Sequence, residues 1–533
     1  MNIESDVLAK ADLVLINANI ITLNPSQPSA TAIAVKRGRI IKVGSNEEIG
    51  KLIGKKTTVI WLRGKTVIPG LIDTHIHLVD FAKVLSWIDL ENTKSIFEMQ
   101  QCLSEHVKKT PSGKWIIGRG WDENNFAEKR LPTCFDLDAV SPGNPVVFYH
   151  KSGNMCLVNS KAAELAGILW QTDLRDKCAN RKEKISEFTG ILQGDAMSQL
   201  WRVIPEPEEE ELLKATELAI KRIIEAGVTS IHWIVLSDKE AKMLQKFCKK
   251  SKMNLRVYMI IPATLIETPL FSELKKTCKG SRIKVGGAVI FADGYLAART
   301  AALYQAYYDK PETEGKMLLT QEELNSLAIK VQNAGLQLII HAMGDMAVDA
   351  ALTAIETAKC ACGKNLRSRI EQAAVLNQEL IERIGRQEVI VSVQPNVISS
   401  EFSMWSAVEG LGVNRARWLF PINTLLKKGV CVIGGSDCPM EPLNPLLGIK
   451  SAVTREFFTE ERTSVDDALR MYTVNAAYAV FEENLKGTIE PGKLADLTVL
   501  SDNPLTVPPE EIVKISVELT IIGGKVVYKN NTA

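Results

Sequence analysis

The sequence predicts an α/β fold: a distorted (β/α)8 TIM barrel over residues 68–485, with a small β-sandwich formed by the two ends of the chain. Two observations favour this fold. Residues 68–485 alternate short apolar segments with amphipathic helices, as parallel sheets and barrels do. Residues 1–67 and 486–533 carry short strands separated by turns, which is typical of a small sheet or sandwich.

The N-terminal strands are expected where apolar and polar residues alternate, at 11–16, 32–35, 40–44 and 58–62. The pairs Asn17-Ala18 and Arg37-Gly38 mark turns between them. The C-terminal segment repeats this style, with strands expected at 497–500 and 517–528. We infer that 1–67 and 486–533 complete one composite sandwich.

In the central segment, helices and strands are predicted from the spacing of the apolar residues. Helices are expected at 213–224, 323–334 and 347–358, and strands at 227–231, 255–260 and just before His341. A plain barrel needs about 250 residues, so 68–485 is too long for one alone. An insertion at about residues 80–210 accounts for the excess. Insertions between barrel strands and helices overhang the catalytic face, so this one is expected to be a lid.

Composition limits the function classes. The chain has 46% hydrophobic and 24% charged residues and a net charge of +1, which gives no global attraction to nucleic acid or to an anionic membrane. We therefore expect a small-molecule substrate and no nucleic-acid or membrane partner, with a homo-oligomer left open. The acidic, polar start is unlike a signal peptide, and the ten scattered cysteines are typical of reduced thiols. These features favour a cytoplasmic protein.

Chemistry-bearing residues follow several of the apolar runs. His75 and His77 end the first run, and in a strand two such side chains share a face. His341 and Asp437 end two later runs. Ligands at the carboxyl ends of parallel strands would meet at the catalytic face of a barrel. The pattern indicates a metal site.

These motifs carry a resemblance to a known family. The His75-Ile76-His77 run is followed in order by motifs at 291–294, 299–303, 341–345, 435–439 and 486–496. From Ala11 to about Val527, the chain resembles the amidohydrolase superfamily, in the N-substituted formamide deformylase branch (amidohydrolase family 3). The resemblance implies the barrel, the composite sandwich and a metal-dependent hydrolase.

The resemblance also implies roles for the four residues. His75, His77, His341 and Asp437 would bind one divalent metal, with zinc first and iron or manganese as alternatives. A metal of this kind lowers the pKa of a bound water. Asp437, the expected catalytic residue, would accept the water's proton and deliver it to the leaving nitrogen.

Two positions depart from the family. Dinuclear members have a carboxylated lysine where this chain has Val289, and a histidine where it has Gln372. Lys284 is the nearest upstream lysine, and its five-residue offset predicts the opposite face of the strand. A second metal is therefore not expected.

Other polar residues are candidates for contacts around the site. Asp293 is expected behind the metal ligands, orienting a ligand histidine or its own turn. The candidates for substrate binding are Trp121 and Asp122 in the lid, His232, Arg299 and Gln372.

The pattern favours hydrolysis of a non-peptide C–N bond in a small amide, formamide or cyclic amide. Two alternatives stay open. The single-metal ligand set resembles that of heterocycle deaminases, although Gly344-Asp345 offers a shorter acid than the glutamate they use. Because Val289 and Gln372 replace the family's lysine and histidine, the protein could also be a non-catalytic relative that keeps the barrel as a binding module.

Overall fold

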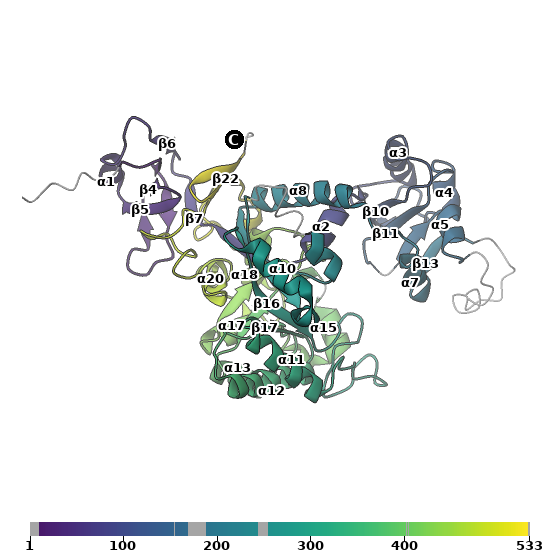
Figure 1. Ribbon diagram of the computed structural model, residues 1–533. Helices are drawn as coiled ribbons and strands as arrows, with labels where there is room; N and C mark the ends of the chain where they lie inside the picture. Colours follow the sequence, from purple (N-terminus) through teal and green to yellow (C-terminus); the bar gives the residue numbers. More distant parts are fainter. Residues whose placement is uncertain are drawn as a thin grey trace, which may run out of the picture. The chain divides into compact units, whose positions relative to one another are not determined.

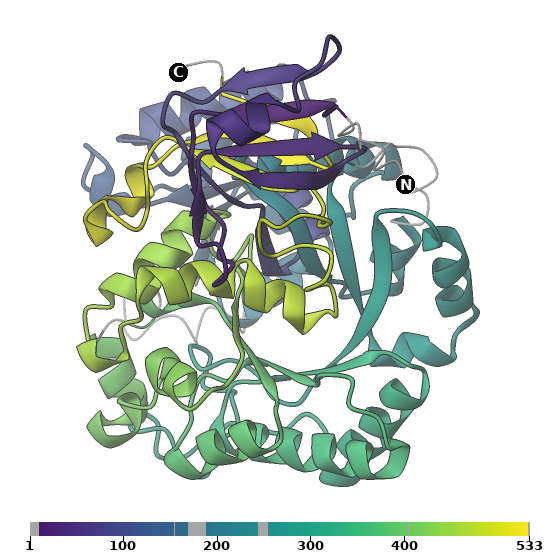
Figure 2. The same ribbon diagram turned by 90° about the vertical axis from the view of Figure 1, so that its left-hand side faces the viewer.

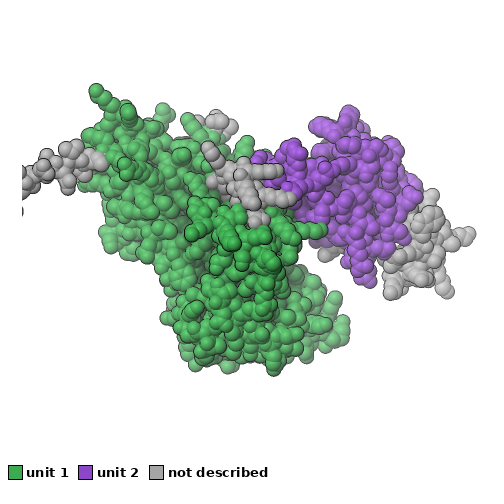
Figure 3. Space-filling model, viewed as in Figure 1, with its two compact units in different colours: residues 1–81, 219–533 green, residues 82–218 purple. Residues whose placement is uncertain are grey.

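The computed structural model describes residues 10–153, 155–168, 188–243, 254–400, 402 and 404–530. They form two compact units (Figure 3): unit 1 contains residues 1–81 and 219–533, and unit 2 contains 82–218. Unit 2 overlaps the insertion expected at about 80–210, and its role as a lid stays a prediction. Part of that insertion, including 169–187, lies outside the described residues.

The centre of unit 1 is an eight-stranded parallel sheet (Figure 2). Its strands run in sequence order round the sheet: β8 (Leu71–Ile76), β14 (Val228–Ile234), β15 (Arg256–Pro262), β16 (Ile283–Phe291), β17 (Gln337–Ala342), β18 (Arg369–Gln372), β19 (Ile390–Val393) and β20 (Val432–Gly434). A parallel bridge between Ile76 and Cys438 joins the last strand to the first. The predicted barrel is confirmed.

Helices cover the outside of this barrel (Figures 1 and 2). They are α10 (Pro269–Cys278), α11 (Gln321–Asn333), α12 (Asp345–Cys362), α13 (Gln378–Arg386), α14 (Pro395–Ser400), α15 (Met404–Leu411), α16 (Val413–Ala416), α17 (Ile422–Lys427), α18 (Pro445–Thr454), α19 (Val465–Met471) and α20 (Val474–Ala479). Helix α8 (Glu209–Glu225) begins in unit 2 and ends in unit 1. The expected helices at 213–224, 323–334 and 347–358 fall on α8, α11 and α12. Among the described residues, no helix has both the length and the apolar character to cross a bilayer.

Strands from both ends of the chain form the sandwich, as predicted (Figure 2). One sheet has the order β5-β4-β1-β6, and the other has β23-β22-β21-β7-β2-β3. The N-terminal strands are β1 (Leu13–Ile16), β2 (Asn19–Ile21), β3 (Ser29–Ala30), β4 (Ala32–Lys36), β5 (Arg39–Gly44), β6 (Thr58–Trp61) and β7 (Thr66–Pro69). The C-terminal strands are β21 (Leu497–Leu500), β22 (Val517–Ile522) and β23 (Lys525–Lys529).

The sandwich core and an ion pair hold this part of unit 1 together. Leu15 and Ile20 from the N-terminal strands pack in one buried cluster with Val499 and Ile521 from the C-terminal strands. Apolar burial of this kind is worth about 1.5–3 kcal/mol for each large side chain. Arg256 of barrel strand β15 also pairs with the buried Asp496 carboxylate through Nε at 2.5 Å and Nη2 at 2.9 Å.

Unit 2 has its own five-stranded sheet, ordered β13-β12-β11-β10-β9. Its described elements are β9 (Ile88–Asp89), α3 (Ile96–Val107), β10 (Ile116–Trp121), α4 (Cys134–Asp138), β11 (Val146–His150), β12 (Met155–Val158), α5 (Ser160–Leu165), β13 (Ile191–Gln193) and α7 (Asp195–Trp201). A core of its own, including Trp121, Phe126 and Phe148, makes the insertion a compact body rather than an extended loop.

Candidate metal centre

Three of the four predicted metal ligands meet at the carboxyl ends of β8 and β20. Their ligand atoms all lie within 4.8 Å of one another. The Asp437 Oδ1 atom is 3.3 Å from His75 Nε2 and 3.3 Å from His77 Nε2. Two imidazoles and a carboxylate at this spacing suit a divalent metal such as zinc.

The backbone of the barrel closure positions Asp437. Its amide donates to the His75 carbonyl oxygen at 2.8 Å, and the His77 amide donates to the Cys438 carbonyl oxygen at 2.9 Å. At Gly435, an added Cβ would lie 2.6 Å from His75 Cβ, so a larger residue would force the two strands apart. The close approach allowed by Gly435 therefore brings the carboxylate to the imidazoles.

A buried carboxylate stands behind His75. The Glu371 Oε2 atom lies 2.6 Å from His75 Nδ1, which leaves Nε2 for the metal side of the ring. Glu371 also pairs with Arg369, and neither side chain of this pair is exposed. Carboxylates in this position fix the tautomer and orientation of metal-ligating histidines.

Nearby positive charges lower the pKa values of the two carboxylates at the centre and so oppose the effect of burial, which raises them. Burial alone raises the pKa of Asp437, but His75 and His77 hold that pKa well below its usual range. Burial likewise raises the pKa of Glu371, whereas Arg369 and His75 lower it to about 2. Both groups are therefore carboxylates at neutral pH. Burial lowers the pKa of His75, but the two carboxylates outweigh it and raise that pKa to about 10, so a metal that binds there replaces a proton on the ring.

His341 lies at the end of β17 but outside the three-residue group. Burial, and then the charge of His75, lowers the pKa of His341 to about 4, so its ring is neutral at pH 7. No described residue hydrogen-bonds to either ring nitrogen. A neutral imidazole with free nitrogens is able to join a metal as a further ligand.

Asp293 supports the turn that follows His341. Its carboxylate accepts hydrogen bonds from the amides of Ala302, Met343 and Gly344 at 2.9–3.0 Å. Its Oδ1 atom is 3.8 Å from His341 Nδ1. Of the two expected roles, the structure gives Asp293 the backbone role and places it near, but not in hydrogen-bond contact with, the histidine ring.

Gln372 lies against the metal group, while Val289 does not reach it. Gln372 Nε2 donates to Asp437 Oδ2 at 3.3 Å. Val289 packs in the apolar interior of the barrel with Ile260 and Ile339. Neither side chain can replace the lysine or histidine that the family uses for a second metal.

The expected orientation of Lys284 was wrong. Met259 pairs with Val285, but the next residue, Ile260, pairs with Gly287, so β16 contains a bulge at Gly286. The bulge shifts the alternation by one residue. As a result, Lys284 and Val289 both face the barrel interior. Lys284 Nζ lies over the Tyr258 ring at 5.5 Å and donates to the Val480 carbonyl oxygen, not to the metal group.

The structure gives Arg299 and His232 partners within the protein. Arg299 was expected to contact substrate, but its guanidinium donates to both oxygens of Asp309 at 2.7–3.0 Å and is therefore already paired within the protein. His232 is fully buried inside the barrel, where its Nδ1 accepts from Arg369 Nη1 at 3.0 Å. It lies behind Glu371 rather than in contact with the metal group.

The two lid candidates lie in unit 2. Trp121 is completely buried, and its indole N–H donates to the Phe148 carbonyl oxygen at 2.9 Å, so it is a core residue there. Asp122 caps the short 3-10 helix of 123–125 through its Oδ1 atom. Asp122, Glu123 and His150 also bring their ligand atoms within 4.8 Å of one another.

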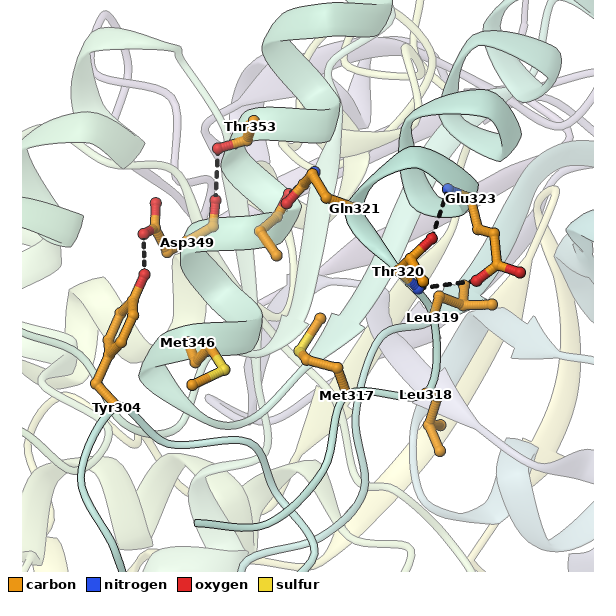
Figure 4. A pocket seen from close by; sticks show the side chains of 11 residues that line it. Tyr304, Met317, Leu318, Leu319, Thr320, Gln321, Glu323, Met346, Asp349 and Thr353 are labelled. Carbon is orange, nitrogen blue, oxygen red and sulfur yellow. Dashed lines mark hydrogen bonds between the residues drawn. The ribbon is translucent and has the colours of Figure 1, made fainter.

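A surface pocket of about 520 Å³ lies elsewhere in unit 1, beside α11 and α12 (Figure 4). Tyr304, Met317 and Met346 form part of its lining, and the Tyr304 hydroxyl donates to Asp349. No member of the metal group lines it.

The comparisons with known proteins agree with this geometry. The model of a family described as the amidohydrolase family matches residues 58–528. The chain belongs to the amidohydrolase family. It is similar to the putative amidohydrolase YtcJ of Bacillus subtilis, with 32% identity over 94% of this chain and 96% of that protein. The N-substituted formamide deformylase of Arthrobacter pascens is 27% identical over 97% of this chain and 98% of that protein.

A solved structure agrees with these relatives. An uncharacterized metal-dependent hydrolase from Pyrococcus furiosus superposes with a TM-score of 0.75 and 28% identity, covering 93% of this chain and all of that one. This amidohydrolase is thus a metal-dependent hydrolase of C–N bonds, with a candidate metal group at the carboxyl ends of its barrel strands.

Sequence reasoning did not identify Glu371 or Arg369 as site residues. Both stand in β18, of which only the last residue, Gln372, was expected at the site. A signal was present, because an arginine and a glutamate at alternate positions of a short barrel strand face the same interior. A buried pair of opposite charges in that interior is a candidate support for a metal ligand.

Proposed function

We propose that this amidohydrolase hydrolyses an amide, formamide or cyclic amide of a small molecule with one divalent metal, zinc by its donor set. His75, His77 and Asp437 would hold the ion, and His341 would complete the set. The observation that carries the proposal is the cluster of His75, His77 and Asp437 at the barrel mouth, with Val289 and Gln372 where a second metal beside it would need ligands.

The bound ion would supply a Lewis acid that polarises the carbonyl and acidifies a water molecule. The chain's own residues then handle the protons. Asp437, an anion held beside both imidazoles, takes a proton from the attacking water and delivers it to the departing nitrogen. A C–O bond forms, the C–N bond breaks, and an acid and an amine leave. Glu371 keeps His75 oriented throughout.

Deamination of a heterocycle is the second candidate, because a one-metal ligand set suits it. The shorter acid at Asp345 argues against it. Its Oδ1 atom accepts from the amides of Tyr304 and Met346, so this carboxylate is engaged at the start of α12. Amide hydrolysis needs no acid at that position.

A substrate panel separates the candidates. N-substituted formamides, hydantoins and aminoheterocycles are incubated with the metal-loaded protein, and formate, ring-opened product and ammonia are measured. Release of formate or ring-opened product, lost in Asp437→Asn, supports the proposal. Ammonia from aminoheterocycles alone supports deamination.

Metal analysis tests the number of ions and the non-catalytic alternative. About one metal per chain, lost in His77→Ala and retained in the exposed control His106→Ala, is the expected result. Two metals per chain, both retained in His150→Ala, would show that Val289 and Gln372 do not prevent a second site in the barrel. A chain that binds no metal under reducing, chelator-free conditions would favour the binding-module alternative.

A further inference from the structure

Gln394 is a buried glutamine whose side chain has no partner in the described part of the protein. Its exposed fraction is 0%, and neither its Oε1 nor its Nε2 atom makes a hydrogen bond. An unpaired buried carboxamide costs about 1–3 kcal/mol. A buried carboxamide in this state is a candidate contact for a bound molecule, and its place in the fold decides whether a ligand can reach it.

The strand pattern of β19 directs this side chain into the mouth of the barrel. Ile390 packs in the barrel interior, and Ser392 accepts a hydrogen bond there from Arg369 Nη2 at 3.2 Å. Gln394 is the next residue of that alternation. Pro395 follows it, and a residue before proline stays extended, so the strand geometry continues through Gln394.

The neighbouring strand places Gln394 level with the metal ligands. Val393 pairs with Gly434, and the Gly435 amide donates to the Val393 carbonyl oxygen at 3.0 Å, so the pairing of β19 with the β20 segment extends one residue beyond β20. In the same register Gln394 lies level with Gly435, and Asp437 is the next residue on that face of the β20 segment. Gln372 reaches Asp437 from β18 and also has an unpartnered Oε1 atom.

We propose that Gln394 binds the amide group of the substrate, its Oε1 atom accepting the N–H of the scissile bond. This inference rests on the proposed function, since it assumes a C–N substrate at the metal centre. It narrows the substrate class to amides that carry an N–H, such as secondary formamides and cyclic amides, over N,N-disubstituted ones. A site built to pair an N–H rejects a ligand that lacks it, because the acceptor is then left buried and unpaired.

Two probes that differ by a methyl group in place of this N–H hydrogen test the proposal. Benzohydroxamate and N-methylbenzohydroxamate both bind metals through their oxygens, and their Kd values for the zinc-loaded protein are measured by calorimetry. The wild type is expected to prefer benzohydroxamate by roughly 3- to 10-fold, the value of one net hydrogen bond. Gln394→Met is expected to bind both equally.

Gln332→Met is the matched control. Gln332 is also buried with an unpartnered Oε1 atom, but it lies on α11 and donates to Ser368, away from the metal group. This variant is expected to keep the wild-type preference. A preference that survives in Gln394→Met overturns the inference while leaving the proposed function intact. Failure of both probes to bind the zinc-loaded protein overturns the proposed function, and the inference with it.

Thermal unfolding provides a second readout. Methionine has the length of glutamine without its polar atoms, so Gln394→Met is expected to keep or raise the Tm of the metal-free protein. A purely structural glutamine would behave in the opposite way. A lower Tm together with unchanged hydroxamate preference assigns Gln394 to the fold and overturns the proposal.

Discussion

Replacing Glu371 by glutamine tests the support behind the metal centre. Glu371 is fully buried, with Oε1 paired to Arg369 and Oε2 2.6 Å from His75 Nδ1. Glutamine keeps the shape but removes the charge. Its carbonyl oxygen can still accept from Arg369, but its NH₂ group cannot accept from His75 Nδ1.

Two magnitudes follow from these contacts. Arg369 is left as a buried cation without its anion, which costs about 3–5 kcal/mol when one partner of such a pair is removed. His75 loses the acceptor that fixes its ring, which lowers metal affinity roughly 10- to 100-fold. Urea unfolding of the metal-free protein measures the first effect, and competition with a chelator of known affinity measures the second.

The matched control is Glu379→Gln, at an exposed position in the first turn of α13. It is expected to change the free energy of unfolding by less than about 0.5 kcal/mol and to leave metal affinity unchanged. If Glu371→Gln binds metal as tightly as the wild type, Glu371 does not orient His75, and the argument from the 2.6 Å contact is refuted.

Three further predictions follow. Burial, and then the charge of Arg369, keeps the pKa of His232 well below 6.5, so below pH 6.5 the unfolded chain binds a proton that the folded chain does not. The free energy of unfolding should therefore fall by up to about 1.4 kcal/mol per pH unit below pH 6.5. Urea titrations of His232→Gln should show a smaller slope. Gly286→Ala should destabilise unit 1 by about 1–3 kcal/mol, because the added Cβ would lie 2.0 Å from the Tyr258 ring. Gly50→Ala, where the added Cβ meets open space, is the control. Equal urea midpoints for the two variants would contradict the prediction. Arg256→Met should lower the free energy of unfolding by about 3–5 kcal/mol, because the buried Asp496 carboxylate loses its cation. Arg222→Met, which breaks a surface pair with Glu225, is the control and should lower it by less than about 1 kcal/mol. Similar losses in the two variants would contradict the prediction.

The grouping of His75, His77 and Asp437 could be predicted because the signal for each residue is local in the sequence. His75, His77 and Asp437 each end an apolar run, and parallel strands bring such ends to one face. The composite sandwich was predictable for the same reason, since short alternating strands at 11–62 and 497–528 can be read directly from their patterns.

The support of the centre was not predictable in this way. The contact of Glu371 with His75 joins residues 296 positions apart and depends on the register of the four barrel strands between them, β14 to β17. The predicted orientation of Lys284 was wrong because the alternation of side chains along β16 is shifted by one residue at a bulge. The pair Gly286-Gly287 was the available signal, since glycine inside a strand often marks such an irregularity.

The sandwich also constrains when the protein can fold. Strand β7 pairs with β21, so Val67 from near the start of the chain lies opposite Val499 from near its end. While the chain is being synthesised, the apolar face around Leu15 and Ile20 lacks this cover until residues 497–522 have left the ribosome. Assembly of the sandwich therefore comes late, and the nascent chain carries an exposed sheet edge through most of its synthesis, which makes that edge a natural target for chaperones.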